Sequence, residues 1–236
     1  MTVTCTIEAR LNSSRLPGKS MYALGGRPLI SYAVEAARAS GVVDRIILCT
    51  TDRTADEVLV RYGKAAGIDV FRGSESDVAG RVAAAVRDGS STNIFLTGDN
   101  PFVTPDLIAE ALRQFVITEA DYFCTTHMKY CQWWDEPPVL PTGLSVQIAQ
   151  TDFFLEAEAA TDANDPIREH STMVMYRNRF PGRKYQAFQL PADLDTQFDM
   201  DRRYTVDTPA DFAAAEHLIM RLDQATLPNL LRASVE

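Results

Sequence analysis

Short apolar runs alternate with amphipathic stretches along the first half of the chain. The β-branched run at 3–9 is typical of a buried strand, and apolar residues recur with helical spacing over 28–40. Further strands are predicted at 45–50, 68–71, 93–97 and 121–126. Further helices are predicted at 55–66, 78–87 and 105–116. Strands separated by helices of this length predict an α/β fold with a mainly parallel, doubly wound sheet and helices on both faces.

The pattern changes after Thr126. Residues 127–142 are rich in aromatic residues and proline and show no period, which is typical of a long loop or of an excursion from the main sheet. Beyond this stretch the pattern predicts strands at 143–150, 184–190 and 204–207 and helices at 152–160, 165–177 and 208–220. Since the sequence has no linker or internal repeat, we expect one Rossmann-like domain over 1–236 with a small inserted lobe at about 127–190.

The composition is that of a globular protein with a net negative charge. Of 236 residues, 46% are hydrophobic and 23% are charged, and 32 acidic against 23 basic side chains give a net charge of −9. This balance disfavours nonspecific binding to nucleic acid or to an anionic membrane. No run approaches the roughly 18 apolar residues of a membrane span, and Glu8 and Arg10 interrupt the first apolar stretch. We therefore expect a cytoplasmic protein without a signal peptide.

Four cysteines are spread along the chain, and two of them lie near a histidine in a way that raises the question of a zinc site. Cys124, His127 and Cys131 have metal-binding side chains, but no C-x-x-C pair or fourth ligand accompanies them. A chain of this length buries enough surface to fold without disulfides or a structural metal. The pattern therefore favours buried apolar thiols over zinc.

A basic loop follows the first predicted strand. The segment E-A-R-L-N-S-S-R-L-P-G-K at 8–19 contains Arg10, Arg15 and Lys19 within ten residues. The carboxyl ends of parallel strands open into the usual ligand crevice, and arginine forks, ammonium groups and backbone amides suit phosphate oxygens. The Walker P-loop is an alternative motif, but its first glycine falls on Ser13. We expect a phosphate site, and the alternative is a solvated basic loop without a ligand.

Several motifs along the chain carry a resemblance to one enzyme family. They are the 8–19 segment followed by L-G-G-R-P-L-I, then V-F-R-G-S-E-S-D-V at 70–78, L-T-G-D-N-P at 96–101, D-P-I-R-E-H-S-T at 165–172 and Y-T-V-D-T-P-A-D-F at 204–212. Together these motifs resemble the sugar-activating cytidylyltransferases: CMP-Kdo synthetases, CMP-sialate synthetases and especially the SpsF-type branch of spore-coat polysaccharide synthesis. The resemblance spans most of the chain, and it implies an enzyme that joins CTP to an acceptor oxygen and releases pyrophosphate.

The resemblance also implies roles for individual residues. The expected nucleotide-binding residues are Ala9, Arg10, Leu11, Ser13, Arg15, Lys19, Arg72, Ser74, Asp77 and Thr97. Among them, Arg15 and Lys19 are expected to act in catalysis together with Asp99. Asp99 and Asp207 correspond to the two aspartates that bind Mg²⁺ in the family. The resemblance further implies a homodimer built through the excursion at about 127–190.

The positions of Asp99 and Asp207 support a magnesium site independently of the resemblance. Asp99 follows the apolar run 93–97, and Asp207 ends the run 204–207, so both carboxylates are expected at the carboxyl ends of strands. Mg²⁺ binds one or two carboxylates together with phosphate oxygens and water. The alternative is that either aspartate caps a helix, because aspartate before a proline-led helix is a common start signal.

The residues expected to bind the acceptor depart in part from the family's pattern. The family segment G-L-D-V-E is G-L-S-V-Q here, so Ser145 and Gln147 replace two acids, and the loss of negative charge would suit a more anionic acceptor. Arg168, Glu169 and His170 match the family's R-E-H element. Arg168 suits a carboxylate or phosphonate of the acceptor, and its alternative is an ordinary ion pair on a helix surface.

Two adjacent tryptophans in the aperiodic stretch have two interpretations. Trp133 and Trp134 either line the acceptor pocket or bury against a second subunit, because tryptophan and tyrosine are enriched at protein interfaces. We favour the interface, because the related synthetases dimerise through an excursion in this region.

The sequence leaves two other functions open. The same fold transfers other nucleotides to sugar phosphates, and a chain of this family could also bind nucleotide as a regulatory subunit without turnover. Retention of Arg15, Lys19, Asp99 and Asp207 argues against lost turnover. The leading prediction is a Mg²⁺-dependent cytidylyltransferase that uses an acidic sugar or another small anionic acceptor to make a CMP-linked product.

Overall fold

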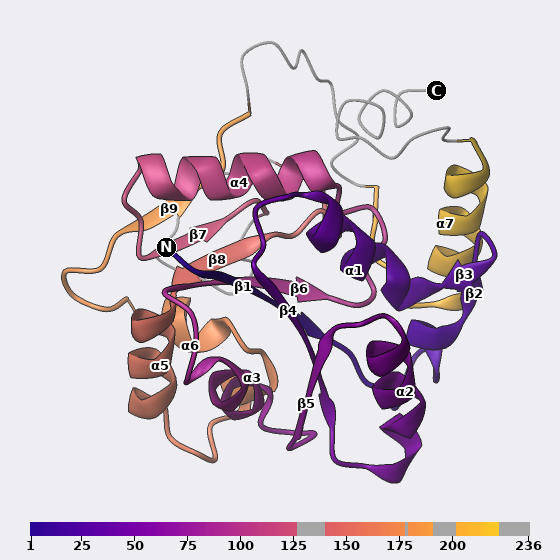
Figure 1. Ribbon diagram of the computed structural model, residues 1–236, viewed down its shortest axis with the longest axis horizontal. Helices are drawn as coiled ribbons and strands as arrows, with labels where there is room; N and C mark the ends of the chain where they lie inside the picture. Colours follow the sequence, from indigo (N-terminus) through magenta and orange to yellow (C-terminus); the bar gives the residue numbers. More distant parts are fainter. Residues whose placement is uncertain (127–139, 178, 191–201, 222–236) are drawn as a thin grey trace.

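A seven-stranded sheet with the order β5–β4–β1–β6–β8–β7–β9 forms the centre of the computed structural model, which describes residues 1–126, 140–177, 179–190 and 202–221 (Figure 1). The strands are β1 (Val3–Glu8), β4 (Arg45–Thr51), β5 (Asp69–Gly73), β6 (Thr92–Thr97), β7 (Tyr122–Cys124), β8 (Gln147–Gln150) and β9 (Tyr185–Ala187). β8 runs antiparallel to β6 and β7, and the other neighbouring strands pair in parallel. The mainly parallel α/β sheet that the sequence predicts is therefore confirmed.

Helices cover both faces of the sheet, as predicted. One face packs against α1 (Leu29–Ala39), α2 (Glu57–Ala65), α4 (Pro105–Ile117) and α7 (Pro209–Arg221). The other face packs against α3 (Val78–Val86), α5 (Thr151–Ala160) and α6 (Met173–Tyr176). The strand period of two divides the core between these layers: Leu48 of β4 joins the first cluster, and its neighbours Ile47 and Cys49 join the second.

Short elements connect the sheet and its covering helices to the residues of the candidate active site. They are the 3₁₀ helices η1 (Lys19–Met21), η2 (Thr54–Asp56) and η3 (Pro166–Glu169) and the small hairpin of β2 (Ala23–Leu24) and β3 (Arg27–Pro28). Side-chain caps fix the starts of α3 and α4. The Asp77 side chain accepts a hydrogen bond from the Gly80 amide at the start of α3, and Thr104 accepts one from the Leu107 amide at the start of α4.

Two predicted elements are wrong, and long-range contacts explain both. The helix predicted over 165–177 is instead η3, a break, and the short α6, because the break places Ser171 against Glu8 of β1. The strand predicted over 204–207 is an extended segment outside the sheet. It is held by single backbone bonds, from the Tyr204 amide to the Thr142 carbonyl at 2.7 Å and from the Val206 amide to the Asp99 carbonyl at 2.9 Å.

The lobe predicted at about 127–190 lies only partly within the described residues. Its described part contributes β8, β9 and α5 to the central sheet and its cover. Trp133 and Trp134, and the His127 and Cys131 of the zinc alternative, fall outside the described residues. The dimerisation role of the lobe stays a prediction. Within the described ranges, the helices are too short or too polar for any of them to cross a bilayer.

Candidate active site

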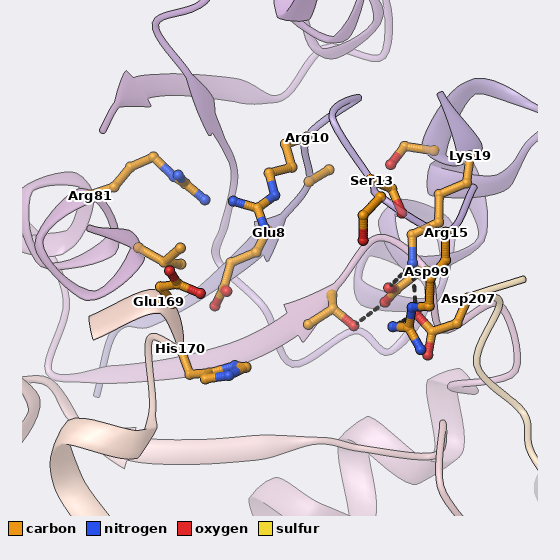
Figure 2. Close-up of a pocket in the computed structure, with 15 residues that line it drawn as sticks. Glu8, Arg10, Ser13, Arg15, Lys19, Arg81, Asp99, Glu169, His170 and Asp207 are labelled. Carbon is orange, nitrogen blue, oxygen red and sulfur yellow. Dashed lines mark hydrogen bonds and ion pairs between the residues drawn. The ribbon is translucent and has the colours of Figure 1, made fainter. Parts of the chain in front are cut away.

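A pocket of about 300 Å³ opens where β1 and β6 end and the basic loop begins (Figure 2). We call it the first pocket. It brings together most of the residues that the sequence singles out, from four separate stretches of the chain. The predicted residues that line it are Ala9, Arg10, Ser13, Arg15, Lys19, Thr97, Asp99, Glu169, His170 and Asp207.

The ammonium group of Lys19 links the two aspartates at one side of this pocket. Its Nζ donates to Asp99 Oδ2 at 2.6 Å and to Asp207 Oδ1 at 3.0 Å, and it also donates to the Val206 carbonyl at 2.9 Å. The Lys19 residue is only 8% exposed. A buried ammonium is tolerated because all three of its protons have oxygen partners. The basic loop, β6 and the segment before α7 therefore meet at one cation.

Arg15 and Arg203 complete the surroundings of Asp207. Arg15 Nη2 lies 2.8 Å from Asp207 Oδ1, and Arg203 Nη2 lies 2.8 Å from Asp207 Oδ2. The side chain of Arg15 remains 59% exposed, so most of its guanidinium faces the open pocket. Such a guanidinium can offer its other donors to an anionic ligand.

Neither aspartate acts as a helix cap, which was the alternative interpretation. Thr208 Oγ1 accepts a hydrogen bond from the Asp211 amide, and Asp211 Oδ2 accepts one from the Thr208 amide, so these two residues close the start of α7 reciprocally. Asp99 Oδ1 accepts from Thr97 Oγ1 at 2.6 Å. Both carboxylates are thus turned toward side chains of the pocket.

Backbone groups anchor the basic loop in addition to the ion pairs of Arg15 and Lys19. The Leu11 amide donates to Asp56 Oδ1 at 2.8 Å, and the Leu11 carbonyl accepts from the Gly18 amide at 2.8 Å. Gly18 has φ +78°, which side chains other than glycine's rarely adopt, so a glycine suits the turn that delivers Lys19. Leu11 itself does not line the pocket; it holds the loop that does.

Besides Leu11, three residues expected to bind nucleotide lie outside the pocket lining: Arg72, Ser74 and Asp77. Arg72 donates to the carbonyls of Thr51 and Arg53 and pairs with Glu57 at 3.0 Å. Ser74 Oγ accepts the Asp77 amide at 3.0 Å. Together with Asp77, these residues build the turn from β5 into α3. None of the three lines the first pocket.

Arg168 is likewise not at the pocket, although its neighbours Glu169 and His170 are. Its guanidinium forms a two-point contact with Asp77, Nε to Oδ1 at 2.9 Å and Nη2 to Oδ2 at 3.0 Å, and it also pairs with Glu158. Burial works to raise the pKa of Asp77, but hydrogen bonds from Arg168 and Gly80 outweigh burial and hold that pKa below its usual value. Arg168 is 6% exposed, so it ties η3 to α3 from inside the fold. It corresponds to neither the acceptor contact nor the surface ion pair that the sequence suggests.

A smaller cavity of about 130 Å³ adjoins the first pocket and receives Ser145 and Gln147. We call it the second pocket. Glu8, Thr97 and His170 line both pockets, so the two are continuous at these side chains. Ser145 Oγ accepts from Thr126 Oγ1 at 3.2 Å, and Gln147 Oε1 accepts from the Tyr122 hydroxyl. Both residues that depart from the family's acidic pattern therefore face the same cavity.

Glu8 and Arg81 are pocket residues to which the sequence assigns no function. Burial raises the pKa of Glu8 to about 7, and the charge of Asp99 adds to this increase. A hydrogen bond from Ser171 and the charge of Arg81 act to lower the pKa of Glu8. Arg81 is 4% exposed and donates to the Ser74 carbonyl. Burial lowers the pKa of His170, Glu169 opposes that shift, and Arg10 adds to it. An acid inside an otherwise apolar strand was the available signal for Glu8.

The donor set at Asp99 and Asp207 fits a magnesium ion. Both carboxylates already hold one cationic atom, Lys19 Nζ, between them, and oxygen is the ligand that Mg²⁺ prefers. No group of three or more His, Cys, Asp or Glu side chains converges anywhere in the described ranges, so these two aspartates would need phosphate oxygens and water to complete the ligands of the ion. Cys124, from the zinc alternative, is a buried cysteine of β7.

Comparison with known proteins decides the family. A family model described as "Cytidylyltransferase" matches residues 4–234. The chain belongs to the cytidylyltransferase family. Among its relatives is the spore coat polysaccharide biosynthesis protein SpsF of Bacillus subtilis, 28% identical over 222 residues, covering 91% of this chain and 85% of SpsF. This confirms the resemblance that the motifs carry.

Solved structures agree with the fold of this cytidylyltransferase. A cytidylyltransferase from Leptospira borgpetersenii superposes with a TM-score of 0.80 at 21% identity, covering 95% of this chain and 89% of that one. A CMP:2-keto-3-deoxy-manno-octonic acid synthetase complexed with CTP superposes with a TM-score of 0.66 at 16% identity, covering 94% and 99%. Family membership also confirms the predicted enzyme class, a nucleotidyltransferase.

Proposed function

We propose that this cytidylyltransferase transfers CMP from CTP to an oxygen of a small acidic acceptor, most simply a sugar acid, and releases pyrophosphate. The observation that carries the proposal is the convergence of Arg15, Lys19, Asp99 and Asp207 in one pocket at the strand ends. The synthetase complexed with CTP has a similar fold, and its name gives 2-keto-3-deoxy-manno-octonic acid, a sugar acid, as the group that is joined to CMP. The product would be a CMP-linked intermediate for glycan or small-molecule synthesis.

The basic residues of the loop suit the triphosphate of CTP. Arg15 is half open to solvent, and Arg10 has one guanidinium nitrogen on the Glu75 carbonyl at 3.1 Å and the rest of its fork exposed. Ser13, Ser14 and Ser20 line the same cavity and can donate further hydrogen bonds. These groups would hold the β- and γ-phosphates and leave the α-phosphorus toward β1 and β6.

Asp99 and Asp207 would hold Mg²⁺, which when bound neutralises phosphate charge and favours departure of pyrophosphate. The acceptor oxygen forms a bond to the α-phosphorus while the bond from that phosphorus to the bridging oxygen breaks. Arg15 and Lys19 would stabilise the charge that grows on the leaving pyrophosphate. The chain needs no covalent intermediate for this exchange.

The test is pyrophosphate release from each nucleoside triphosphate in the presence of Mg²⁺ and a panel of acceptors. The panel contains 2-keto-3-deoxy-manno-octonic acid, a sialic acid and several sugar phosphates, and mass spectrometry identifies the product. We expect turnover with CTP and a sugar acid only. Turnover with another nucleotide and a sugar phosphate would favour the alternative enzyme, and CTP binding without any product would favour a regulatory subunit.

Metal binding has a readout that does not depend on turnover. We expect Mg²⁺ to raise the melting temperature of the wild-type protein in the presence of CTP and to have a smaller effect on Asp207→Asn, because that variant loses one carboxylate of the site. An equal shift in both proteins would show that Asp207 does not hold the metal.

We also propose that the enzyme works as a cytoplasmic homodimer whose interface includes Trp133 and Trp134. Sedimentation of the wild-type protein and of Trp134→Ala tests this assembly. A dimer for the wild type and a weaker dimer for the variant are expected, with CTP affinity unchanged. A monomeric wild-type protein would rule the dimer out.

A further inference from the structure

Glu8 occupies the place where the first and second pockets meet. It is the last residue of β1, which lies between β4 and β6 in the sheet, and its side chain lines both cavities. In Figure 2 the Glu8 carboxylate lies apart from the cluster of Lys19, Asp99 and Asp207. A ligand that spans both pockets would therefore pass this carboxylate, away from the residues that hold the metal.

The Glu8 carboxylate has hydrogen-bonding capacity to spare. Ser171 Oγ donates to Glu8 Oε1, and no other side chain or backbone group among the described residues donates to this carboxylate. The surrounding cations do not pair with it: Arg10 contacts the Glu75 carbonyl, and Arg81 contacts the Ser74 carbonyl. A carboxylate accepts several hydrogen bonds, so Glu8 Oε2 is available to a ligand.

The second pocket offers neutral groups around this acid. Its other polar side chains belong to Thr97, Ser145, Gln147, His170, Ser171, Thr172 and Tyr176. No lysine or arginine is among the described residues that line it. An anionic group placed here would face Glu8 without a compensating cation, which is unfavourable in a half-buried cavity. The part of the acceptor that enters must therefore be uncharged and able to donate.

We propose that Glu8 recognises the acceptor by accepting a hydrogen bond from a hydroxyl group that enters the second pocket. The proposal rests on the proposed function, and it states which part of the acceptor enters the second pocket. The hydroxyl-bearing part lies against Glu8, and the acidic group of the acceptor stays outside the second pocket, whose described lining contains no lysine or arginine. Ser145 and Gln147 then serve hydroxyl groups, and the more anionic acceptor that their sequence suggests is not needed to explain them.

Steady-state kinetics of Glu8→Ala and Glu8→Gln test this assignment, with the best acceptor of the wild-type enzyme as the probe. At pH 8, above the pKa of about 7 of Glu8, we expect the KM for that acceptor to rise about 10- to 100-fold in Glu8→Ala, because a hydrogen bond to a charged group is lost. Glu8→Gln keeps a carbonyl oxygen and should lie between the two. The Kd for CTP, measured by calorimetry, should stay within about threefold of the wild type, because Glu8 accepts no donor from the phosphate-binding residues.

Glu35→Gln is the matched control, because it removes an exposed carboxylate on α1 that pairs with Arg27 far from both pockets. It should behave as the wild type. The assignment is overturned if Glu8→Ala leaves the acceptor KM unchanged, or if it weakens CTP binding as much as acceptor binding. If the wild-type enzyme uses no acceptor with CTP, the proposed function fails and the role of Glu8 fails with it.

A deoxy analogue of the acceptor separates recognition from a general structural effect. Removal of the hydroxyl that meets Glu8 should lower kcat/KM in the wild-type enzyme by about the factor that Glu8→Ala loses, and the two changes should not add. If every deoxy analogue in the series loses the same factor in the variant as in the wild type, Glu8 does not contact a hydroxyl of the acceptor.

Discussion

Lys19 and Asp99 are 80 positions apart in the chain, and the ammonium of one donates to the carboxylate of the other at 2.6 Å. The contact joins the basic loop after β1 to the end of β6, two neighbouring parallel strands. Because Lys19 also donates to Asp207, the same ammonium fixes the segment before α7. The positions of the proposed triphosphate site and of the proposed metal site are therefore not independent of each other.

Asp99→Asn tests the metal site most directly. The amide keeps the size of the side chain but loses the charge that balances Lys19 and that we propose binds Mg²⁺. We expect turnover to fall about 100- to 1,000-fold, comparable with the loss of one electrostatic group at other catalytic centres, while CTP affinity falls less than about tenfold. Pyrophosphate release gives the first quantity and calorimetry the second.

The control for this variant is Asp69→Asn, an exposed carboxylate of β5 that pairs with Arg45 outside the pocket. Its turnover should match that of the wild-type enzyme. Unchanged turnover in Asp99→Asn would remove Asp99 from the catalytic machinery and leave its bond to Lys19 as a purely structural contact.

The sequence predicts the frame of the fold because that frame depends on local periodicity. Each predicted strand from 3–9 to 93–97 corresponds to a strand of the sheet, and each intervening helix is present. The position of β8 between β6 and β7 does not follow from periodicity, because it depends on which sheet edge a later strand reaches. The same limit applies to 204–207, whose extended backbone pairs with single groups rather than with a strand.

The sequence predicts the site residues that are charged and lie at strand ends. It does not predict the role of a residue such as Arg168, which depends on the partners that it meets when it is buried. Arg10, Arg15, Lys19, Asp99 and Asp207 are polar residues at strand ends, and they do meet in one pocket. Arg168 has the same kind of side chain, but its partners Asp77 and Glu158 are 91 and 10 positions away, and only the packing of η3 with α3 and α5 brings them together.

Arg168 should contribute stability rather than acceptor binding. Arg168→Met leaves Asp77 without its two-point partner, leaves the Thr161 carbonyl without a donor, and leaves the Glu158 carbonyl with the Thr161 amide alone. Removal of one partner from a buried pair costs about 3 kcal/mol of unfolding free energy, and urea denaturation measures it. In the double variant with Asp77→Asn, the two losses should overlap. Fully additive losses would contradict a direct interaction.

The stability of the wild-type protein should depend on pH through Glu8. Its pKa is about 7 in the folded state against an ordinary value of 4.5, so between these values the folded state keeps a proton that the unfolded state has released. The contribution of Glu8 is therefore greatest below about pH 4.5, and it declines as pH rises to about 7. Glu8→Gln cannot titrate, so its unfolding free energy lacks this component.

Urea denaturation of both proteins from pH 4 to 8 measures the difference directly. The free energy of unfolding of the wild type minus that of Glu8→Gln should decrease across this window and become constant above about pH 7. A difference that stays flat, or that rises with pH, would mean that the folded protein does not raise the pKa of Glu8.

Gly143 should be needed for the placement of Asp207. It has φ +101°, and a Cβ at this position would lie 2.3 Å from the Thr205 amide nitrogen and 2.3 Å from the Tyr204 carbonyl carbon. Backbone atoms cannot move aside as a flexible side chain does, so Gly143→Ala must displace the segment that carries Asp207. We expect a loss of about 2 kcal/mol or more in unfolding free energy, together with weaker Mg²⁺ binding in the presence of CTP.

Gly182→Ala separates the backbone strain of positive φ from the close contact of a new Cβ with neighbouring backbone atoms. Gly182 has φ +78° but no heavy atom within 4 Å of the position of its Cβ, so alanine there meets only the backbone strain of positive φ. Its unfolding free energy should fall by about 1 kcal/mol, and Mg²⁺ binding should stay at the wild-type level. Equal effects of the two substitutions on Mg²⁺ binding would show that the contact of Gly143 with Tyr204 and Thr205 does not position Asp207.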